Sequence, residues 1–581
     1  MTASLVAPAS RRPRPRARWV LPATPDSAPA LALATELRLP EPICQLLVAR
    51  GHAAPDSARR FLRPRLDQLH APSALGGLDD AVERLARAVR AGETILVHGD
   101  YDVDGICSTT LLTRALRSFG GRVVPFIPRR VEDGYDLSDA GVRAAQAAGA
   151  SVVVTCDCGT SALAAVSALC AAGIDVIVSD HHLPGGPLPQ CLAVLNPKRP
   201  GCSYPDKDLA AAGVAFKLAL ALARALGANE NPVYGMLDLV ALATIADIAP
   251  LRGENRVFAR YGLKLLQESG NPGIRALVRA AGLDGKTLTA GRVGYILAPR
   301  LNAVGRLGHA LRGVELLTTE SEAEANRIAR DLEELNRQRQ ELDRATQREA
   351  LALVDRLDLD ATYGLVLAAE GWHPGVIGIV ASRVVEETGR PTVMIALADG
   401  EGKGSGRSIS ALDLHGALGE CRDLLVRFGG HRAAAGITIR ADQVPAFAER
   451  FNDVARSRLT EEDLVGELRV DLELPLDAAS EELEALLRHF EPFGVGNPAP
   501  TLLSRGVRLA APPRPVGQDG VRFRFRTARG ELEAIAWGMA ARVPELQADG
   551  ALDLVYRLER DDYRGDSRLQ ARVLDLRPSA P

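Results

Sequence analysis

Long hydrophobic runs are absent from this chain of 581 residues, and no apolar segment approaches the roughly 18 residues that a membrane-spanning helix needs. The basic start, with arginines at positions 11, 12, 14, 16 and 18, is typical of the charged head of a signal peptide. However, Pro22, Pro25, Asp26 and Pro29 interrupt the segment that would form its apolar core. The sequence therefore predicts neither a membrane span nor a signal peptide, and we expect residues 1–16 to be disordered.

Cysteine is also sparse, with eight residues in the whole chain. No Cys-x-x-Cys pair is present, which excludes the usual spacings of zinc knuckles and thioredoxin-type redox centres. Cys156 and Cys158 are separated by one residue, and we interpret them as structural thiols. So few cysteines favour a reduced, cytoplasmic setting.

The chain lacks a strong net charge of either sign. Its formal charge is -3, its hydrophobic share is 46%, and its mean hydropathy is -0.01, which together indicate a globular protein. Any contact with nucleic acid must therefore come from local basic surfaces. Because single cores stop growing at roughly 250 to 300 residues, the length predicts about three domains. We find no repeat with a period of roughly 20 to 50 residues.

Acidic residues and histidines gather directly after three short apolar runs. The runs 95–97, 152–154 and 176–178 lead to Asp100, Asp102, Asp104, Asp157, Asp180, His181 and His182. Helical patterns over 108–118 and 161–172 separate the runs, so we predict parallel strands with crossover helices. Ligands collect beyond the carboxyl ends of such strands. Since closely spaced carboxylates repel one another, a metal is the simplest explanation, and Asp247 after a helical segment could complete the cluster.

Four motifs occur in an order that resembles the DHH phosphoesterases. They are HGDYDVDG at 98–105, DCG at 157–159, DHH at 180–182 and ADIAPL at 246–251. The spelling of the first is typical of the bacterial single-stranded-DNA exonucleases of this family. Further matches lie at 300–306, 371–378, 404–408 and 429–436, so the resemblance covers about residues 40 to 577.

The resemblance implies an α/β fold with three domains. We expect a largely disordered tail over 1–40, a DHH-type parallel-sheet catalytic domain over 41–319, a connector helix over 320–358, a second α/β DHH-associated domain over 359–464, and a C-terminal OB-like β-barrel over 465–581. The segment 320–357 holds no glycine or proline, which supports the long helix. The alternation over 521–526 supports a strand with Arg522, Arg524 and Arg526 on one face. Pattern alone fits an SH3-like barrel or a small sandwich almost as well as an OB fold.

The resemblance also implies two metal ions. Asp104, Asp157, His181 and Asp247 would hold one ion, while Asp102 and Asp157 would help to hold the other. A set of oxygen and imidazole ligands favours Mn²⁺, with Mg²⁺ as a weaker substitute. Asp180 would fix the tautomer of an imidazole and His182 would contact the scissile phosphate. His98 and Asp100 compete for a further place near metal or water, and we favour Asp100.

Substrate contacts are expected at basic and glycine-rich segments. We predict that the glycine-rich stretches 402–408 and 429–436 fall between the elements of the second domain as turns whose backbone N–H groups bind phosphate. The residues concerned are Ser405, Arg407, Ser408, Gly430, His431 and Arg432. Arg300, Asn302 and Arg306 are placed in a polar loop that reaches phosphates. For Arg129 and Arg130 a phosphate contact and a solvated side chain stay equally open, as do base stacking and core packing for Trp372.

The resemblance implies a metal-dependent 5′-to-3′ exonuclease that hydrolyses single-stranded DNA to mononucleotides in DNA repair and recombination. We expect a monomer whose partners are single-stranded DNA, single-stranded-DNA-binding protein and a RecQ-type helicase. One alternative is a phosphoesterase of oligoribonucleotides, cyclic dinucleotides or pyrophosphate, but the extra β domain and the HGDYDVDG spelling argue against it. Another is a non-catalytic DNA-binding scaffold, which predicts gaps in the ligand set, and the sequence has none.

Overall fold

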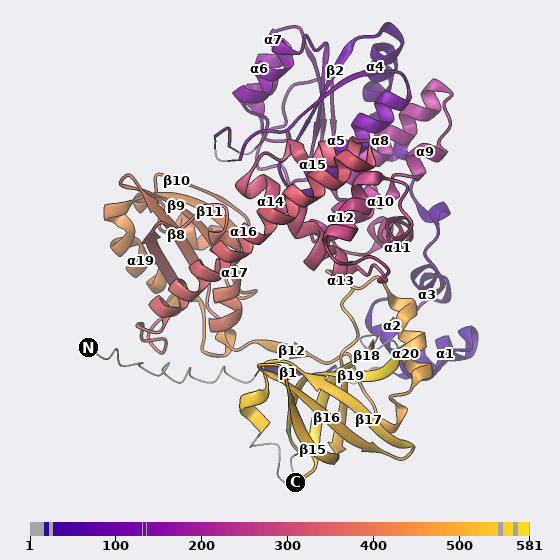
Figure 1. The fold of residues 1–581 in the computed structure, drawn as a ribbon, viewed down its shortest axis with the longest axis vertical. Helices are drawn as coiled ribbons and strands as arrows, with labels where there is room; N and C mark the ends of the chain where they lie inside the picture. The colour runs from indigo at the N-terminus through magenta and orange to yellow at the C-terminus, as the bar shows by residue number, and fades with distance from the viewer. Residues whose placement is uncertain are drawn as a thin grey trace. The chain divides into compact units, whose positions relative to one another are not determined.

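The computed structural model describes residues 17–22, 27–130, 132–134, 136–543, 550–561 and 567–579. The predicted disorder of residues 1–16 concerns residues outside these ranges. The chain forms two compact units, one of residues 1–20 with 337–469 and the other of residues 21–336 with 470–581. Figure 1 shows the elements of both units. None of the helices that the structure describes combines the length and the hydropathy that crossing a membrane would require.

A five-stranded parallel sheet forms the first half of the larger unit. Its order is β3 (Arg122–Phe126), β2 (Thr94–Gly99), β4 (Val152–Cys156), β5 (Asp175–Ser179) and β6 (Ala193–Leu195). Three of these strands contain the three predicted runs, so the parallel-sheet prediction is confirmed.

Alternate residues of these strands pack on opposite faces of the sheet. Leu96, Val153 and Val176 share a core with α6 (Asp139–Ala147) and α7 (Leu163–Ala171). Ile95 and Val97 pack on the other side, with α4 (Leu78–Ala91), α5 (Val103–Ser118) and α8 (Ala211–Leu226). A sheet covered on both faces exposes its strand ends, which is where a site can form.

Helices complete this half of the unit. They are α10 (Leu237–Ala246), α11 (Gly253–Gln267), α12 (Pro272–Ala280), α14 (Ala298–Leu307) and α15 (Leu311–Thr318). The predicted loop over 300–306 is wrong, because these residues lie in α14. Leu301 and Val304 are fully buried one helical turn apart, and this apolar face holds the polar segment in a helix.

The long helix α16 (Glu322–Val354) confirms the helix predicted over 320–357. It leads to the sheet of the smaller unit, whose order is β10 (Arg427–Gly430), β11 (Ala434–Arg440), β9 (Glu401–Arg407), β8 (Thr392–Ala398) and β7 (Leu365–Glu370). Helices α17 (Ile377–Thr388) and α19 (Val444–Arg458) pack against this sheet. In the same unit, β1 (Arg18–Val20) pairs with β12 (Glu467–Arg469) in parallel.

Most residues of the glycine-rich stretches of this unit lie in strands, and only 408 and 431–433 lie between strands as predicted. Residues 402–407 lie in β9, and 429–430 and 434–436 lie in β10 and β11. A Cβ atom at Gly402, Gly404 or Gly406 would meet Ile395, Ile437 or Leu414 side-chain atoms at 2.6, 2.5 and 2.9 Å respectively. Glycine therefore serves close packing on one face of the strand here.

The C-terminal sheet has seven strands, in the order β13 (Leu472–Glu473), β14 (Leu502–Val507), β18 (Leu552–Asp561), β19 (Arg568–Pro578), β17 (Gly530–Ala536), β16 (Gly520–Thr527) and β15 (Leu509–Val516). The strand predicted over 521–526 is confirmed as part of β16, and β15 was not predicted. Prolines at 512, 513 and 515 argue against a strand in the sequence, but β15 lies at the edge of the sheet, where proline is tolerated.

Three N-terminal helices share the core of this C-terminal sheet. They are α1 (Ser27–Leu37), α2 (Glu41–Ala49) and α3 (Pro55–Leu62), and they bury Leu33, Leu47 and Phe61 in one cluster with Phe523 and Tyr556. The structure thus differs from the predicted tail of residues 1–40 over 27–37, because the apolar face of α1 finds a partner more than 400 residues away in the sequence.

Candidate metal centre

The acids of the first motif are held at the starts of two helices. Asp102 precedes α5, and its Oδ1 accepts hydrogen bonds from the N–H groups of Asp104 and Gly105 at 2.9 and 3.1 Å. The two carboxylate oxygens of Asp104 accept from the N–H groups of Ala211 and Ala212, at 2.7 and 2.8 Å, where α8 begins. Helix N-termini favour a carboxylate through their unpaired N–H groups and their partial positive charge.

Asp157 follows β4 in a left-handed conformation, with φ of 66°. Its own N–H donates to the carbonyl of Ser179 at 3.0 Å. Such a backbone costs roughly 1–2 kcal/mol for a residue with a side chain and is characteristic of functional sites. The side chain is 2% exposed, so the strained turn directs a carboxylate into the interior.

The third motif supplies two imidazoles in different states of hydrogen bonding. Asp180 Oδ1 lies 2.8 Å from His182 Nδ1 and also accepts the N–H groups of His181 and His182, while its Oδ2 accepts from Thr160 N–H at 3.0 Å. His181 Nδ1 lies 3.0 Å from the Leu209 carbonyl, an acceptor that leaves Nε2 directed at the acids. This second contact is the usual way to fix a metal-binding tautomer.

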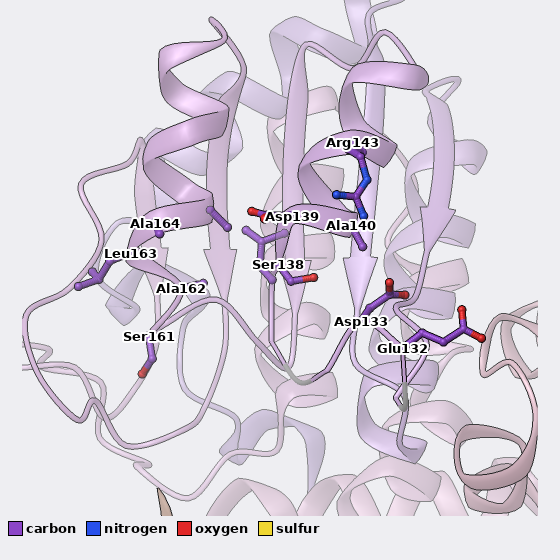
Figure 2. Close-up of a pocket in the computed structure, with 12 residues that line it drawn as sticks. Glu132, Asp133, Ser138, Asp139, Ala140, Arg143, Ser161, Ala162, Leu163 and Ala164 are labelled. Carbon is purple, nitrogen blue, oxygen red and sulfur yellow. The ribbon is translucent and has the colours of Figure 1, made fainter. Parts of the chain in front are cut away.

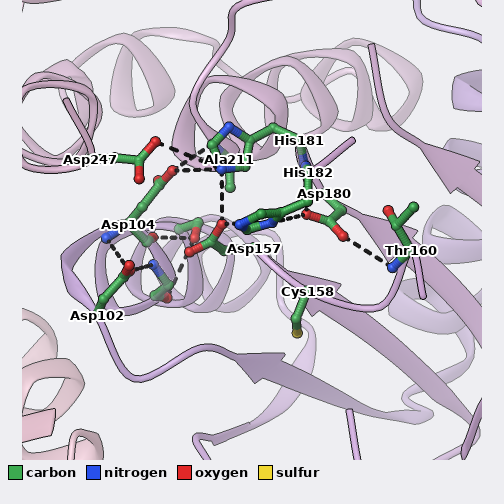
Figure 3. Close-up of polar contacts among 12 residues, drawn as sticks. Asp102, Asp104, Asp157, Cys158, Thr160, Asp180, His181, His182, Ala211 and Asp247 are labelled. Carbon is green, nitrogen blue, oxygen red and sulfur yellow. Dashed lines mark hydrogen bonds and ion pairs between the residues drawn. The ribbon is translucent and has the colours of Figure 1, made fainter. Parts of the chain in front are cut away.

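These side chains form three overlapping groups of possible metal ligands (Figure 3). The groups are Asp157, His181 and His182; Asp104, His181 and Asp247; and Asp100, Asp102 and Asp157. Figure 3 shows all of these residues except Asp100 with labels. Within each group the ligand atoms lie within 4.8 Å of one another. His181 Nε2 is 3.1, 3.8 and 3.7 Å from oxygens of Asp157, Asp104 and Asp247. Asp157 and His181 each belong to two groups, which suits two neighbouring ions.

Three buried atoms of this cluster have no hydrogen bond to the residues that the structure describes: Asp100 Oδ1, Asp157 Oδ1 and His181 Nε2. Buried polar atoms are nearly always satisfied, so these three fit metal coordination. Carboxylate oxygens with an imidazole nitrogen form a donor set that suits Mn²⁺ and, less well, Mg²⁺.

The electrostatics of the cluster also favour a bound cation. Burial, followed by the charge of Asp102, raises the pKa of Asp104 to about 7. Burial and the neighbouring acids raise the pKa values of Asp100, Asp157 and Asp247 well above the usual range. A divalent cation would remove this repulsion and keep the carboxylates ionised.

The two histidines are driven to opposite states. Burial, and then the charge of His182, lower the pKa of His181 to about 3, so His181 is neutral, as a ligand must be. Burial also lowers the pKa of His182, but the hydrogen bond to Asp180 and the charge of Asp180 outweigh it. The pKa of His182 is therefore raised to about 9. The site therefore pairs a neutral imidazole with a cationic one.

Comparison with known proteins decides the family. Models of the DHH family N-terminal domain, the DHHA1 domain and the RecJ OB domain match residues 94–244, 361–457 and 470–575. The single-stranded-DNA-specific exonuclease RecJ of Dickeya dadantii is 38% identical over 98% of this chain and 99% of its own length. The chain belongs to the RecJ family. RecJ of Bacillus subtilis is 35% identical over 96% of this chain and 70% of its own length.

A solved RecJ structure has the same fold. The crystal structure of RecJ from Thermus thermophilus in complex with Mn²⁺ superposes with a TM-score of 0.84 and 33% identity, covering 97% of this chain and 80% of that one. The Mg²⁺ complex of the same protein has a TM-score of 0.77. The α/β fold with a DHH domain, a DHHA1 domain and an OB-type C-terminal domain is therefore confirmed.

The structure distinguishes between His98 and Asp100, the two candidates for a further place near metal or water. Asp100 lies in a ligand group with Asp102 and Asp157. His98 is fully buried in β2, its Nδ1 lies 3.5 Å from the Cys158 sulfur, and it belongs to none of the three groups among the described residues. The geometry thus favours Asp100, as the sequence interpretation did.

Three of the predicted contact residues of the DHH domain, Arg300, Arg129 and Arg130, are already engaged with protein groups. Arg300 pairs with Glu333 and donates to the Ile296 carbonyl, and Asn302 and Arg306 are part-buried on the same helix. Arg129 pairs with Glu132 at 2.8 Å, and Arg130 lies over the Tyr101 ring at 4.8 Å from its centroid.

The predicted phosphate contacts of the DHHA1 domain gather around the end of β9. Arg407 donates to Ser405 Oγ at 3.0 Å, and a Cβ at Gly378 would meet both side chains. His431 is exposed in the turn between β10 and β11. Of the remaining predicted contacts, Gly430 is exposed with φ of 142°, Ser408 Oγ donates to Leu412, and Arg432 donates to Ser410.

Trp372 has a structural role in the same domain. It is 6% exposed, packs with Leu351 and Val380, and donates from Nε1 to Glu349 at 2.8 Å. The structure therefore supports core packing, and not base stacking.

Sequence reasoning missed several residues that support the metal centre. Asp136 Oδ1 accepts from Gly159 N–H at 2.7 Å and so steadies the turn after Asp157. Asn196 donates to Thr160 Oγ1 and to the His182 carbonyl, at 3.0 and 2.8 Å. Thr160 and Asn196 are single polar residues that follow strands. Such residues are a weak sequence signal, because they are neither acids nor histidines.

The DHH domain also contains a separate pocket of about 680 Å³. Figure 2 shows its walls at the starts of α6 and α7, with Asp139, Arg143 and Ser161 among the lining residues. None of its lining residues belongs to a ligand group, so this pocket is not the metal centre.

Proposed function

We propose that this chain is a metal-dependent exonuclease that hydrolyses single-stranded DNA in DNA repair and recombination. The observation that carries the proposal is the set of three overlapping ligand groups with buried atoms that have no hydrogen bond among the described residues. The curated relatives of the chain are single-stranded-DNA-specific exonucleases by name, and solved RecJ structures hold Mn²⁺ or Mg²⁺.

In this proposal each side chain has a defined role. Asp104, Asp157, His181 and Asp247 would hold one ion, while Asp100, Asp102 and Asp157 would hold the other. When bound, two such ions supply an activated water and absorb negative charge on the scissile phosphate. His182, kept protonated by Asp180, would donate to a phosphate oxygen of the substrate.

We further propose that Ser405, Arg407, Ser408, Gly430, His431 and Arg432 bind a terminal phosphate of the substrate. These residues lie near the C-terminal end of β9 and in or beside the turn between β10 and β11. They supply cationic and neutral hydrogen-bond donors, which suit a phosphate. Recognition of a terminal 5′-phosphate would make the enzyme an exonuclease that proceeds 5′ to 3′ and releases mononucleotides.

Cellular setting and domain limits belong to the same proposal. We place the chain in the cytoplasm as a monomer with single-stranded-DNA-binding protein and a RecQ-type helicase as partners. The proposed limits are 41–319 for the DHH domain, 320–358 for the connector, 359–464 for the DHHA1 domain and 465–581 for the OB domain.

Degradation of end-labelled single strands tests this function. With Mn²⁺ present, a 5′-phosphorylated strand labelled at its 5′ end should release labelled mononucleotide from the first turnover, whereas a 3′ label should stay on gradually shortened strands. Circular single strands and blunt duplexes should resist, and a chelator should stop all hydrolysis. Rapid cutting of circular strands would refute a mechanism that needs a terminal phosphate.

A further inference from the structure

Asp247 differs from Asp102 and Asp104 of the metal centre in how its carboxylate is held. Asp102 and Asp104 each accept two backbone hydrogen bonds, but the Asp247 carboxylate accepts none from the residues that the structure describes. Asp247 ends α10, and its side chain is 26% exposed. The position of this carboxylate therefore depends on the backbone that carries it.

That backbone is strained at the next residue. Ile248 has φ of 60°, a left-handed conformation that is a clear outlier for a β-branched side chain, and the side chain is 65% exposed. Because the exposed Ile248 side chain makes little packing contact, side-chain packing does not explain the left-handed backbone. The left-handed residue closes α10, since the N–H groups of Ile248 and Ala249 donate to the carbonyls of Ile245 and Thr244 at 3.3 and 3.1 Å.

The loop that follows Ile248 contacts a turn of the C-terminal segment, residues 489–497, which we call the brace turn. Leu251 N–H donates to the Val495 carbonyl at 2.7 Å, and Arg252 Nε donates to the Gly496 carbonyl at 2.9 Å. At Gly494 and Gly496 the turn approaches Leu251 and Pro250 so closely that an added Cβ would lie 2.7 and 3.0 Å from their side chains. The loop after Asp247 is thus fixed against the brace turn.

Arg256 holds the brace turn against α11. Its guanidinium is 3% exposed and donates to the carbonyls of Phe490, Glu491 and His489 at 2.9, 2.9 and 3.3 Å. Arg256 Nε donates to the Phe61 carbonyl at 3.0 Å, and the group lies 4.0 Å from the centroid of the Phe61 ring. No carboxylate forms an ion pair with it among the described residues. A buried cation that binds only carbonyls is suited to fixing backbone.

We propose that Arg256 and the brace turn are a positioning device that sets the loop of Asp247 for its metal ion. The inference rests on the proposed two-metal function. In this proposal, the segment before the OB barrel supports the metal centre. This role is separate from any contact of the barrel with DNA. Supporting groups around metal ligands typically contribute about 10-fold to 100-fold in metal affinity.

The test measures Mn²⁺ affinity of the full chain by electron paramagnetic resonance. Arg256→Met removes the donors, and Gly496→Ala pushes the brace turn away from Pro250 and Arg252 without removing a charge. Lys264→Met removes an exposed charge from the same helix. Gly517→Ala introduces the same left-handed strain, at φ of 64°, where no atom lies within 4 Å of the added Cβ. These two variants are the matched controls.

We expect Arg256→Met to weaken Mn²⁺ binding by about tenfold or more and Gly496→Ala to weaken it in the same direction, while both controls bind as the wild type does. Hydrolysis by the two test variants should recover at high Mn²⁺, and their affinity for single-stranded DNA without metal should be unchanged. If Arg256→Met does not fold, as judged by circular dichroism, Gly496→Ala decides. Wild-type Mn²⁺ affinity in the folded test variants would overturn this inference alone. A wild-type chain that binds no Mn²⁺ would overturn the proposed function with it.

Discussion

Asp157 combines the features that make a single residue decisive for this site. It is buried, it has a left-handed backbone, and its Oδ1 has no hydrogen bond within the described part of the chain. It is also the residue that two ligand groups share through a carboxylate. Burial and the charges of Asp102 and Asp104 raise its pKa, so in the absence of metal this residue opposes folding.

Replacing Asp157 with Asn should therefore lower the rate of hydrolysis but raise the melting temperature of the metal-free protein. Asn tolerates the left-handed backbone, so the fold should survive. Mn²⁺-dependent hydrolysis should fall by at least about a thousandfold, since a bridging ligand supports several kcal/mol of transition-state stabilisation. The metal-free variant should melt at a higher temperature than the metal-free wild type, because one buried charge is gone. Asp139→Asn, at an exposed position outside the ligand groups, should change neither property.

At the scale of elements, the arginine face predicted on β16 is only partly basic. Arg524 and Arg526 stand opposite Glu533 and Glu531 of β17, and Arg524 pairs with Glu531 at 3.2 Å. Arg522 instead stands opposite Arg514 of β15, and like charges in such positions repel one another. The register therefore divides the face into a neutralised end and an end with excess positive charge.

DNA binding should follow that division. In a metal-free protein, Arg514→Glu with Arg522→Glu should weaken binding of single-stranded DNA and flatten its salt dependence by about two units of slope. Arg524→Glu with Arg526→Glu should have a smaller effect, because those arginines already have acidic neighbours. Fluorescence anisotropy across a salt series measures both quantities. Equal slopes for the two double variants and the wild type would place the DNA path elsewhere.

At the scale of the whole molecule, the metal centre couples ion binding to folding. Asp100, Asp102, Asp104, Asp157 and Asp247 come together only in the folded larger unit, so an ion binds the folded state in preference to the unfolded one. Mn²⁺ at about a hundred times its dissociation constant should stabilise that unit by about 2.7 kcal/mol. Thermal unfolding followed by calorimetry should show a higher melting temperature that a chelator reverses. In Asp157→Asn the Mn²⁺-dependent shift should be greatly reduced, and a full shift there would argue against Asp157 as a ligand.

Local pattern in the sequence was enough to predict the main features of the site. Apolar runs that end on acids predicted parallel strands with a metal cluster at their carboxyl ends, and the structure brings Asp102, Asp104, Asp157, His181 and Asp247 into shared ligand groups. This works because the strand period, the helical period and the crossover rule are local or nearly local properties. The motifs added the family, which the comparisons then confirmed.

Only the tertiary structure decided the features that depend on neighbours distant in sequence. The glycines of β9 are strand residues because Ile395, Ile437 and Leu414 pack against them, and the polar segment around Arg300 is helical because Leu301 and Val304 are buried. Arg256 meets the brace turn across more than 230 residues, a contact that no local pattern encodes. Periodicity along the chain determines which element forms, whereas the steric and hydrogen-bonding partners of each side chain exist only after the elements have packed.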